Sequence, residues 1–478
     1  MEDRESDVDY KNIQNLDTVD ENIKNTEYNF PYDKKKRIIK LILLLLLIII
    51  LLIALIIIIY IIFFKKKEND EKNENKENNE NNQEWKNNCL KWDEIKKVCL
   101  ICDTGYKLDD GKCILNYSFK AVYLTQSDNE EIKLLNTSIN NILEIIIDDK
   151  KEDPCTNYIF PSPGKHTIYL LMNLTNITSL NGLFNWVNKM ISISFTKKFN
   201  TESINDMKYM FNNCHSLTSI DISTFNTQKV YEMDYFFKNC YSLKSIDLSS
   251  LRTNNLFNID YMFYNCISLT SIDLSNFNIK NVIDISYLFY NCYSLKTIIF
   301  NEFDTFNVID MSYMFYNCSS LISINLKSFN TTSVTNMTSM YENCISLYSI
   351  DISNFQTYNL IIAEKMFKNC SSLSNININN FNTENLKEIN YMFYGCSSLK
   401  SLDLSSFNIE NQIKMEYIFY HCNKLEYLDI SSIRNISGAN NTLFSEDIDT
   451  KGVIKVHTNI SDIIKDQIPL NWTIEVVE

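Results

Sequence analysis

The sequence predicts an α/β solenoid, in which short parallel strands alternate with helical turns in coils of 26 residues, together with a transmembrane helix near the N-terminus. Cysteines recur at a constant interval of 26 residues, and a fixed period of this length is typical of solenoids. These cysteines are Cys214, Cys240, Cys266, Cys292, Cys318, Cys344, Cys370, Cys396 and Cys422. An uncharged run of leucine and isoleucine between residues 41 and 64 predicts the membrane helix.

The composition fits a folded chain that does not bind nucleic acid. Of the 478 residues, 45% are hydrophobic and 22% are charged, so most of the chain can bury a core. The net charge is −14. Binding to nucleic-acid phosphates requires clustered positive charge, so we expect no nucleic-acid partner.

The first 84 residues predict a membrane anchor between two polar segments. Residues 1–37 are polar and are expected to form a disordered cytoplasmic tail. Residues 38–64 contain the anchor, because Leu41–Phe64 is long enough to span a hydrocarbon core of about 30 Å. Five basic residues precede this run and three follow it, which favours a cytoplasmic N-terminus and extracellular repeats at the plasma membrane. Residues 65–84 are expected to be a disordered stalk.

Residues 85–115 predict a small cysteine-rich module. Four cysteines lie too close together for a hydrophobic core, so two disulfides are expected to hold the module. The four are Cys89, Cys99, Cys102 and Cys113. Three connectivities are possible, and the spacing between Cys99 and Cys102 also occurs in zinc sites. The segment from Cys102 to Cys113 resembles cysteine-rich modules of the growth-factor-receptor and EGF-like type, which favours disulfides.

The first half of each 26-residue unit predicts a short strand. A leucine follows each repeat cysteine by three residues. In the segment from Leu269 to Leu274, alternation places Ile272 and Leu274 on one face and Asp273 on the other. One such unit cannot bury its own apolar side, whereas nine stacked units make a continuous core with a parallel sheet on the concave face.

The second half of each unit predicts a helical return. Val308, Met311, Met314 and Phe315 follow the spacing of a helix face. Acidic or Asn residues lie near the start of this segment in most units, such as Asp206, Asp284 and Asp310, and they suit a helix start.

The repeat unit resembles a known family. The pattern Leu-x-x-Leu-x-Leu is that of a leucine-rich-repeat strand, and Met-Phe-x-x-Cys-x-x-Leu and Phe-Asn-Thr recur in register with it. Over about residues 120–478 the chain closely resembles the BspA-like leucine-rich-repeat surface proteins. The resemblance implies an adhesin or another binding protein of the cell surface.

Caps are expected at both ends of the array, because an open end would expose the core. Residues 116–200 are expected to form an N-terminal cap and a degenerate repeat, with strands at Ile142–Ile147 and His166–Leu171. The nine repeats occupy residues 201–435. Residues 436–478 are expected to form a C-terminal cap with strands at Gly452–His457 and Asn471–Val477.

Two residue ladders have a structural interpretation. Each repeat cysteine precedes a buried leucine, where a small apolar side chain fits, so we expect buried free thiols. An asparagine precedes most of these cysteines, from Asn213 to Asn369, and stacked amides of this kind can satisfy backbone groups between coils. The role of Cys155 is left open.

A third ladder is the candidate binding surface. It is expected to point outward from the strands, where rungs about 4.8 Å apart would favour a cation or a basic partner. Its members are Asp221, Asp247, Asp273, Asn325, Asp351, Asn377, Asp403 and Asp429. The alternative is a solvated polar face without a ligand.

Seven sequons outside the asparagine ladder are candidate glycosylation sites. They are Asn116, Asn136, Asn173, Asn176, Asn330, Asn435 and Asn440.

Nothing in the sequence indicates catalysis. The four histidines lack metal-ligand spacing, and no nucleotide-binding or hydrolase motif occurs. We therefore expect no enzyme activity, no cofactor and no metal. The leading hypothesis is a cell-surface protein that binds a protein or glycan, and the alternative is a passive structural coat protein.

Overall fold

The computed structural model describes residues 89–93, 98–102, 106–109, 112–301, 303–378, 380–407, 413–437, 443–445 and 448–478. The predicted tail, anchor and stalk of residues 1–84 lie outside this part of the chain. Among the described residues, no helix is long and apolar enough to cross a membrane. The chain divides into two units, and the second of them contains residues 114–478 without a break.

The cysteine-rich segment contains four short strands. They are β1 (Cys89–Asp93), β2 (Val98–Cys102), β3 (Tyr106–Asp109) and β4 (Lys112–Leu115). The side chains of its four cysteines lie outside the described part, so the two disulfides stay a prediction.

A mostly antiparallel sheet precedes the repeats, in the order β12-β11-β5-β10-β7-β8. Its strands are β5 (Phe119–Thr125), β7 (Ile142–Ile147), β8 (Lys150–Glu152), β10 (Gly164–Met172), β11 (Met190–Phe195) and β12 (Ser219–Asp221). A separate pair is formed by β6 (Glu130–Lys133) and β9 (Asn157–Phe160), and a short 3-10 turn η1 (Ile139–Asn141) lies between β6 and β7. The two cap strands expected from the sequence are confirmed as β7 and β10.

Strand β11 joins this cap to the solenoid. On one side it pairs antiparallel with β5, and on the other it pairs parallel with β12, the strand of the first cysteine-bearing coil. The cap therefore covers the first coil by continuing its sheet, which leaves no open strand edge between them.

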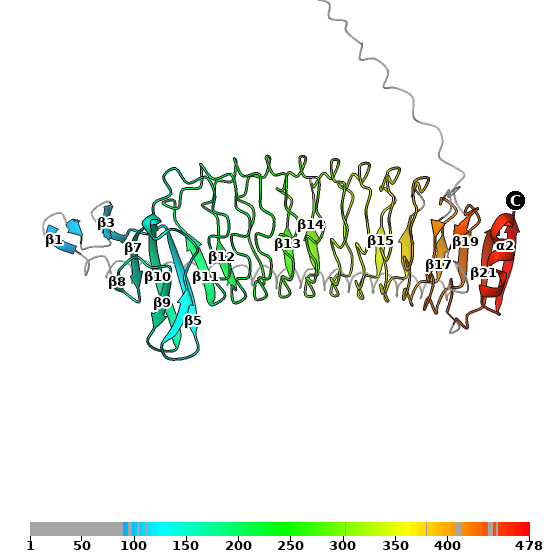
Figure 1. Ribbon diagram of the computed structural model, residues 1–478, viewed down its shortest axis with the longest axis horizontal. Coiled ribbons are helices and arrows are strands. Elements are labelled where there is room, and N and C mark those ends of the chain that lie inside the picture. The colour runs from blue at the N-terminus through cyan, green and yellow to red at the C-terminus, as the bar shows by residue number, and fades with distance from the viewer. Residues whose placement is uncertain are drawn as a thin grey trace, which may run out of the picture. The chain divides into compact units, whose positions relative to one another are not determined.

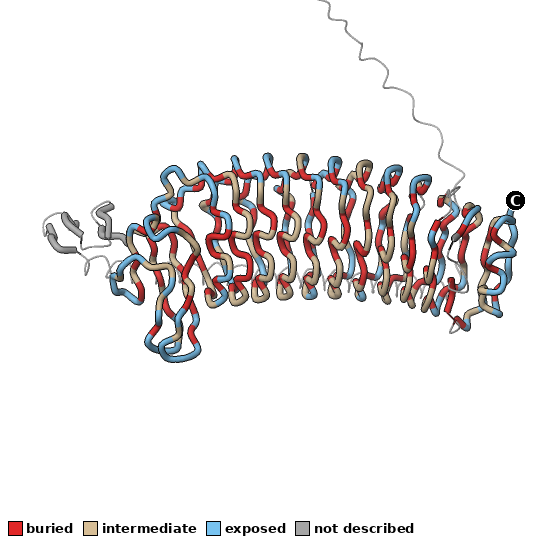
Figure 2. The backbone as a smooth tube through the Cα atoms, viewed as in Figure 1, coloured by how far each residue is buried: buried red, intermediate tan, exposed pale blue. Residues whose placement is uncertain are grey.

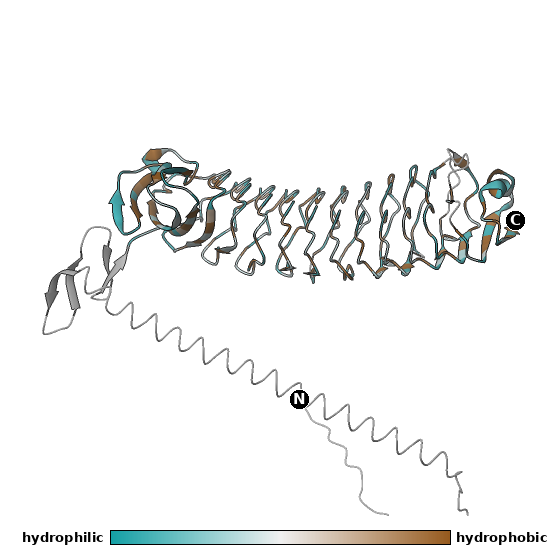
Figure 3. Ribbon diagram, turned by 90° about the horizontal axis from the view of Figure 1, so that it is seen from below, coloured by the Kyte–Doolittle hydropathy of each residue, from teal (hydrophilic) through white to brown (hydrophobic). Residues whose placement is uncertain are grey.

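The coils stack in parallel register, side by side along the array (Figure 1). Their strands include β13 (Ser271–Asp273), β14 (Thr297–Ile299), β15 (Ser349–Asp351), β16 (Asn375–Asn377) and β17 (Ser401–Asp403). Ile272 pairs with Ile298, its equivalent one period later, and both side chains are buried. The predicted period, strand position and inward-facing residues are confirmed. In Figures 1 and 3 the coils follow one another with little curvature, so the strand side is not markedly concave.

The predicted helical return in each unit is wrong. The only α-helix among the described residues is α2 (Thr458–Ile464), which lies after the repeats. The return segment is a run of consecutive turns instead. The N–H groups of Met207 and Tyr209 donate to carbonyls of the next coil at 3.0 and 3.2 Å, whereas the N–H of Met210 donates three residues back, to the carbonyl of Met207. Half of the donors thus bond between coils, and the solenoid is a β-solenoid.

Left-handed residues produce this turn run. The residue five positions before each cysteine, most often Tyr, has positive φ, and so does the residue directly before the cysteine, most often Asn. Examples are Tyr261 (55°) and Asn265 (59°). A non-glycine residue in this conformation costs about 1 kcal/mol. The bonds that these residues make to the next coil offset the cost, since Asn265 donates its N–H to the carbonyl of Tyr290.

Asparagine and threonine side chains connect the coils. Asn291 donates from Nδ2 to Oδ1 of Asn265 at 2.8 Å, and Asn317 donates to Asn291 in the same way. The buried Thr331 of the Phe-Asn-Thr motif donates to the carbonyl of Gln356 in the next coil at 3.0 Å. The asparagine ladder is therefore a column between coils, as expected, but its amides bond to one another and not to the backbone groups that the sequence predicted as their partners.

Columns of equivalent side chains fill the interior, and Figure 2 shows the buried segments recurring from coil to coil. The nine repeat cysteines are free and fully buried. Each thiol donates to a backbone carbonyl of the preceding coil, as Cys292 does to Phe263 at 3.2 Å. Phenyl rings stack beside them, with centroids 5.5 Å apart for Phe263 and Phe289.

The C-terminal segment extends the same sheet. Strands β17, β19 (Tyr427–Ile430), β21 (Gly452–His457) and β22 (Trp472–Val477) pair parallel in that order. Helix α2 and the 3-10 turn η2 (Lys465–Gln467) connect β21 to β22. A small pair, β18 (Ile413–Lys414) and β20 (Ile436–Ser437), lies on the turn side. Both strands expected in this segment are confirmed.

Candidate binding surfaces

The predicted polar ladder lies at the C-terminal ends of the strands. Seven of its eight members are exposed, and parallel register places Asp351 beside Asn377 and Asp403 beside Asp429. Asp429 differs, because it is only 7% exposed and accepts a hydrogen bond from the Tyr427 hydroxyl at 3.2 Å. Asp429 thus keeps the register of the ladder, but its side chain is covered and is not exposed as the others are.

Within the described part of the chain, seven of the eight ladder residues also hold a corner of their own coil by a hydrogen bond. Oδ1 of Asp273 accepts the N–H of Ser275 at 2.8 Å, and the equivalent bond recurs along the ladder. Hydrogen bonds from Ser249 lower the pKa of Asp247, and those from Ser353 lower that of Asp351. Local donors thus satisfy these carboxylates, and among the described residues no acidic, His or Cys group forms a metal-binding cluster.

A second surface, which we call the tyrosine face, lies on the turn side of the coils. Its first row is Tyr209, Tyr235, Tyr261, Tyr287 and Tyr313, and its second row is Tyr264, Tyr290 and Tyr316. Neighbouring rings within a row are stacked, with centroids 4.5–4.7 Å apart. All eight side chains are partly exposed. Because neighbours cover the ring faces, a partner would meet ring edges and phenol groups.

The phenols of this face are neutral hydrogen-bonding groups. Burial raises the pKa of Tyr235 to about 12 and raises that of Tyr264 in the same direction. A row of neutral hydroxyls above an apolar body is chemistry that protein interfaces favour.

Carboxylates accompany the first tyrosine row. Burial raises the pKa of Asp234 to about 6 although Lys208 lies 3.6 Å away. In Asp260, burial and the neighbouring carboxylates of Asp234 and Asp284 raise the pKa to about 7. Lys208 also pairs with Glu232 at 2.5 Å. This part of the face is therefore short of positive charge.

Lysine side chains lie at the ends of the tyrosine rows. The ammonium of Lys238 lies 4.8, 5.0 and 4.7 Å from the ring centroids of Tyr235, Tyr261 and Tyr264. Such contacts are attractive because the ring face is electron-rich. At the other end of the face, Lys368 pairs with Glu342 at 3.0 Å.

An exposed apolar stripe borders the tyrosine face. We define it as Tyr231, Phe257, Ile283 and Ile309, which are 38%, 56%, 56% and 46% exposed. Each of them occupies the corner where the turn segment of its coil begins, nine residues before the cysteine. The next two coils have Thr335 and a half-buried Ile361 at this position, so the exposed stripe is confined to four coils.

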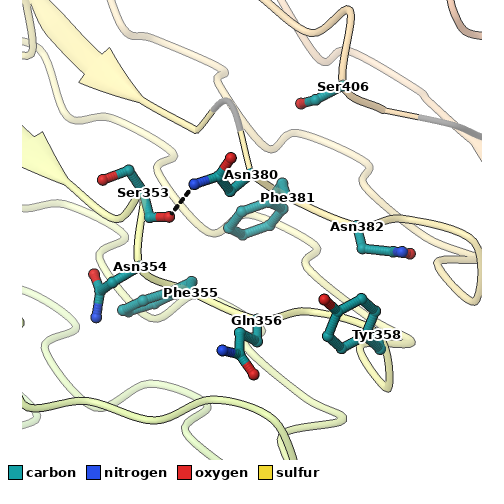
Figure 4. Close-up of a pocket in the computed structure, with 9 residues that line it drawn as sticks. All are labelled: Ser353, Asn354, Phe355, Gln356, Tyr358, Asn380, Phe381, Asn382 and Ser406. Atoms are coloured by element: carbon teal, nitrogen blue, oxygen red, sulfur yellow. Dashed lines mark hydrogen bonds between the residues drawn. The ribbon is translucent and has the colours of Figure 1, made fainter.

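A shallow groove lies at another corner (Figure 4). It has a volume of about 620 Å³ and lies above the buried rings of Phe355 and Phe381. Its rim is formed by the amides of Asn354, Gln356, Asn380 and Asn382, by the exposed ring of Tyr358, and by serines 353 and 406. Asn380 donates from Nδ2 to the carbonyl of Ser353 at 2.7 Å. These groups suit a neutral polar ligand.

One cluster in the cap has the connectivity of a hydrolytic triad. Oγ1 of Thr125 lies 3.1 Å from Nε2 of His166, whose Nδ1 lies 2.6 Å from Asp148. Thr125 is only 3% exposed, and its Oγ1 accepts the N–H of Gly164 at 2.8 Å. A nucleophile must reach its substrate, so we interpret the cluster as a connection between two turns.

The sequons differ in accessibility. Asn173, Asn176 and Asn435 are exposed, whereas both amide hydrogens of Asn136 are used, for Gly182 and Asn185 at 2.9 and 2.7 Å. Asn116 and Asn330 are half-buried, and Asn440 lies outside the described residues.

Sequence reasoning missed the tyrosine face and the stripe. The signal was present, because Tyr recurs five and two residues before successive cysteines. The predicted helix concealed its meaning, because neighbouring helices lie about 8–10 Å apart and equivalent tyrosine rings on them would not stack.

No curated protein matches the chain. Residues 178–301, 265–376, 294–401 and 346–450 each match the family described as "Mycoplasma protein of unknown function, DUF285". These matches together cover residues 178–450, which is more than half of the chain and includes every cysteine-bearing coil. The chain therefore belongs to the DUF285 family of repeat proteins.

Proposed function

We propose that this protein is a cell-surface binding protein, acting in adhesion or recognition, which docks a protein partner on the tyrosine face and the apolar stripe. The observation that carries the proposal is the stripe itself. Four consecutive coils expose large apolar side chains at one corner, and exposed patches of this kind mark interaction sites. Tyrosine beside them is among the residues that dominate binding energy at interfaces.

The alternative is a passive structural coat protein, in which the repeats serve only as a spacer. A spacer needs each coil to stack on the next, and the buried columns achieve that along the whole array. A spacer role does not explain why Phe257 and Ile283 are exposed to solvent, because a later coil has the polar Lys387 at the equivalent position. The local change in surface chemistry therefore favours a binding role.

The location of the protein is part of the proposal. The run Leu41–Phe64 would anchor it in the plasma membrane, with the N-terminus in the cytoplasm and the repeats outside. Free glycans are a second ligand class, and the amide-rimmed groove beside Tyr358 is where the chemistry suits them. The topology predicts that protease added to intact cells cuts the repeats.

Attachment of cells that display the full-length chain tests the binding role. Cells are added to surfaces coated with single extracellular-matrix proteins or single glycans. The variant Phe257→Ser/Ile283→Ser alters the stripe. Its matched control is Tyr348→Ser/Ile322→Ser, which removes one exposed aromatic and one exposed isoleucine from the strand side. A third variant, Asp221→Ser/Asp247→Ser/Asp273→Ser, tests the polar ladder.

We expect attachment to at least one protein coat, with about a tenfold loss in the stripe variant and little change in the control. Loss in the ladder variant alone would move the binding surface to the strand side. Attachment no better than that of cells without the chain, on every coat, would favour the passive coat protein.

A further inference from the structure

The carboxylates of the tyrosine face that lack a cation lie in three neighbouring coils. Asp260, Asp284 and Asp310 occur in successive coils beside the first tyrosine row. Among the ion pairs within the described residues, none involves these three side chains. Asp284 and Asp310 accept N–H groups of Ser286 and Ser312 at 2.8 and 2.7 Å, which are neutral donors.

The chain supplies its own ammonium groups at the edge of this region. Lys208 pairs with Glu232 and Asp234, and Lys238 lies among three tyrosine rings. Two and three coils after Lys208, the equivalent position is Asp260 and then Ser286. The same rows of rings and carboxylates therefore continue into coils that have no lysine at either position.

The apolar stripe runs through those coils. Phe257, Ile283 and Ile309 precede Asp260, Asp284 and Asp310 by one to three residues. Asp284 and Asp310 directly follow their stripe residues, whereas Asp260 lies three residues after Phe257, and Asn258 takes the equivalent position in that coil. Carboxylates thus lie near the stripe in three successive coils, which are about 4.8 Å apart in a parallel stack. A partner that covers the stripe would bring its own side chains next to the three carboxylates.

We propose that the tyrosine face takes a basic polypeptide segment, whose lysine or arginine side chains pair with Asp260, Asp284 and Asp310 while its apolar side chains cover the stripe. This inference rests on the proposed function and names the class of its partner. Charge complementarity selects this occupant, since an acidic segment or an anionic lipid surface would add like charge to the face. Lys208 and Lys238 show that ammonium groups fit there.

The test uses the full-length chain in nanodiscs of neutral lipid, so that lipid does not bind the probes. The probes are three synthetic peptides of equal length that share their leucines and differ only in carrying lysine, glutamine or glutamate. Dissociation constants are measured by fluorescence anisotropy. The variant Asp260→Asn/Asp284→Asn/Asp310→Asn removes the three charges but keeps the oxygens at positions 284 and 310 that accept the N–H groups of Ser286 and Ser312. Its control, Asp221→Asn/Asp273→Asn/Asp403→Asn, removes the same charge from the strand side.

We expect the lysine peptide to bind most tightly and to weaken as salt is added. The face variant should bind it about tenfold more weakly, because three partly exposed charge pairs are lost, and the control should change binding by less than about twofold. The inference is overturned by equal binding of the lysine and glutamine peptides, by equal loss in the two variants, or by no binding of the lysine peptide.

The stripe variant Phe257→Ser/Ile283→Ser separates this inference from the proposed function. If the glutamine peptide binds as well as the lysine peptide and the stripe variant abolishes both, the surface binds partners and only the basic class is wrong. If cells attach to no coat and no peptide binds, both proposals fail together.

Discussion

Replacing one asparagine of the amide column tests how the turn run is stabilised. Asn291 donates from Nδ2 to Asn265, accepts from Asn317, and has φ of 59°. Asn291→Gly removes two neutral hydrogen bonds, worth about 1 kcal/mol each, and keeps the left-handed backbone at little cost. Asn291→Ala removes the same bonds and adds the left-handed penalty of about 1 kcal/mol. We therefore expect losses of about 2 kcal/mol for glycine and about 3 kcal/mol for alanine.

Hydrogen exchange of the full-length chain, followed by mass spectrometry, measures this locally. A repeat array need not unfold in one step, so local opening is the suitable quantity. Amides in the coils of Asn265 and Asn317 should exchange about thirtyfold faster in the glycine variant and more than a hundredfold faster in the alanine variant. Amides of β10 in the cap should keep their rates. Equal rates in the two variants would refute the left-handed penalty, and unchanged rates in both would refute the amide column.

Three further predictions address buried groups. Tyr341 takes the place of phenylalanine in the stacked column, and its buried hydroxyl has no hydrogen-bond partner within the described part of the chain. Tyr341→Phe should therefore stabilise this coil by about 1 kcal/mol, as measured by the same hydrogen-exchange experiment. Burial raises the pKa of repeat thiols such as Cys292, so maleimide should label none of the nine in the native chain and all of them in urea, as read by peptide mass spectrometry. Because the pKa of Asp260 in the folded chain lies above that of the unfolded chain, its stabilising contribution is present at acidic pH and lost as pH rises through about 7. Thermal unfolding of the parent should thus occur at lower temperature at pH 8 than at pH 5, with a smaller difference in Asp260→Asn; an unchanged difference would show that Asp260 is not the group responsible.

The strand half of each coil was predictable from the sequence. Ile272 and Leu274 alternate with exposed residues, and the constant period places each of them beside its equivalent in the next coil. Alternation and period are sufficient to predict which residues are buried, because successive side chains of a strand point to opposite faces whatever the neighbouring residues are. The cap strands were predictable for the same reason.

The turn half was not predictable, because two structures satisfy the same apolar spacing. Met311, Met314 and Phe315 are fully buried, as a helix would also bury them. What excludes the helix is the positive φ of Tyr313 and Asn317, and bonds from alternate N–H groups to the next coil. Tyrosine is not a residue that signals a left-handed backbone, since the conformation is unfavourable for it in isolation. Only contacts between coils make it favourable.

The candidate site was predictable only in part. The polar ladder was expected from the outward positions of the strands, and its exposure was found at every member except Asp429. The capping role of its carboxylates depends on backbone geometry after the strand, which the pattern does not specify. The tyrosine face required knowing that Tyr261 and Tyr287 stack across coils, which follows only from the turn run.

Equivalent residues of successive coils lie side by side, and this register creates both the core columns and the tyrosine face. Double electron–electron resonance tests this register by measuring the distance between two spin labels on exposed strand residues. The labels are attached to a non-natural amino acid, so that the cysteine thiols are not modified. Residues 221 and 351 are five repeats apart, and residues 221 and 403 are seven. Coils stacked in register should give distances of about 24 and 34 Å, increasing by about 4.8 Å per repeat. Distances that do not increase in proportion to the number of repeats would contradict it.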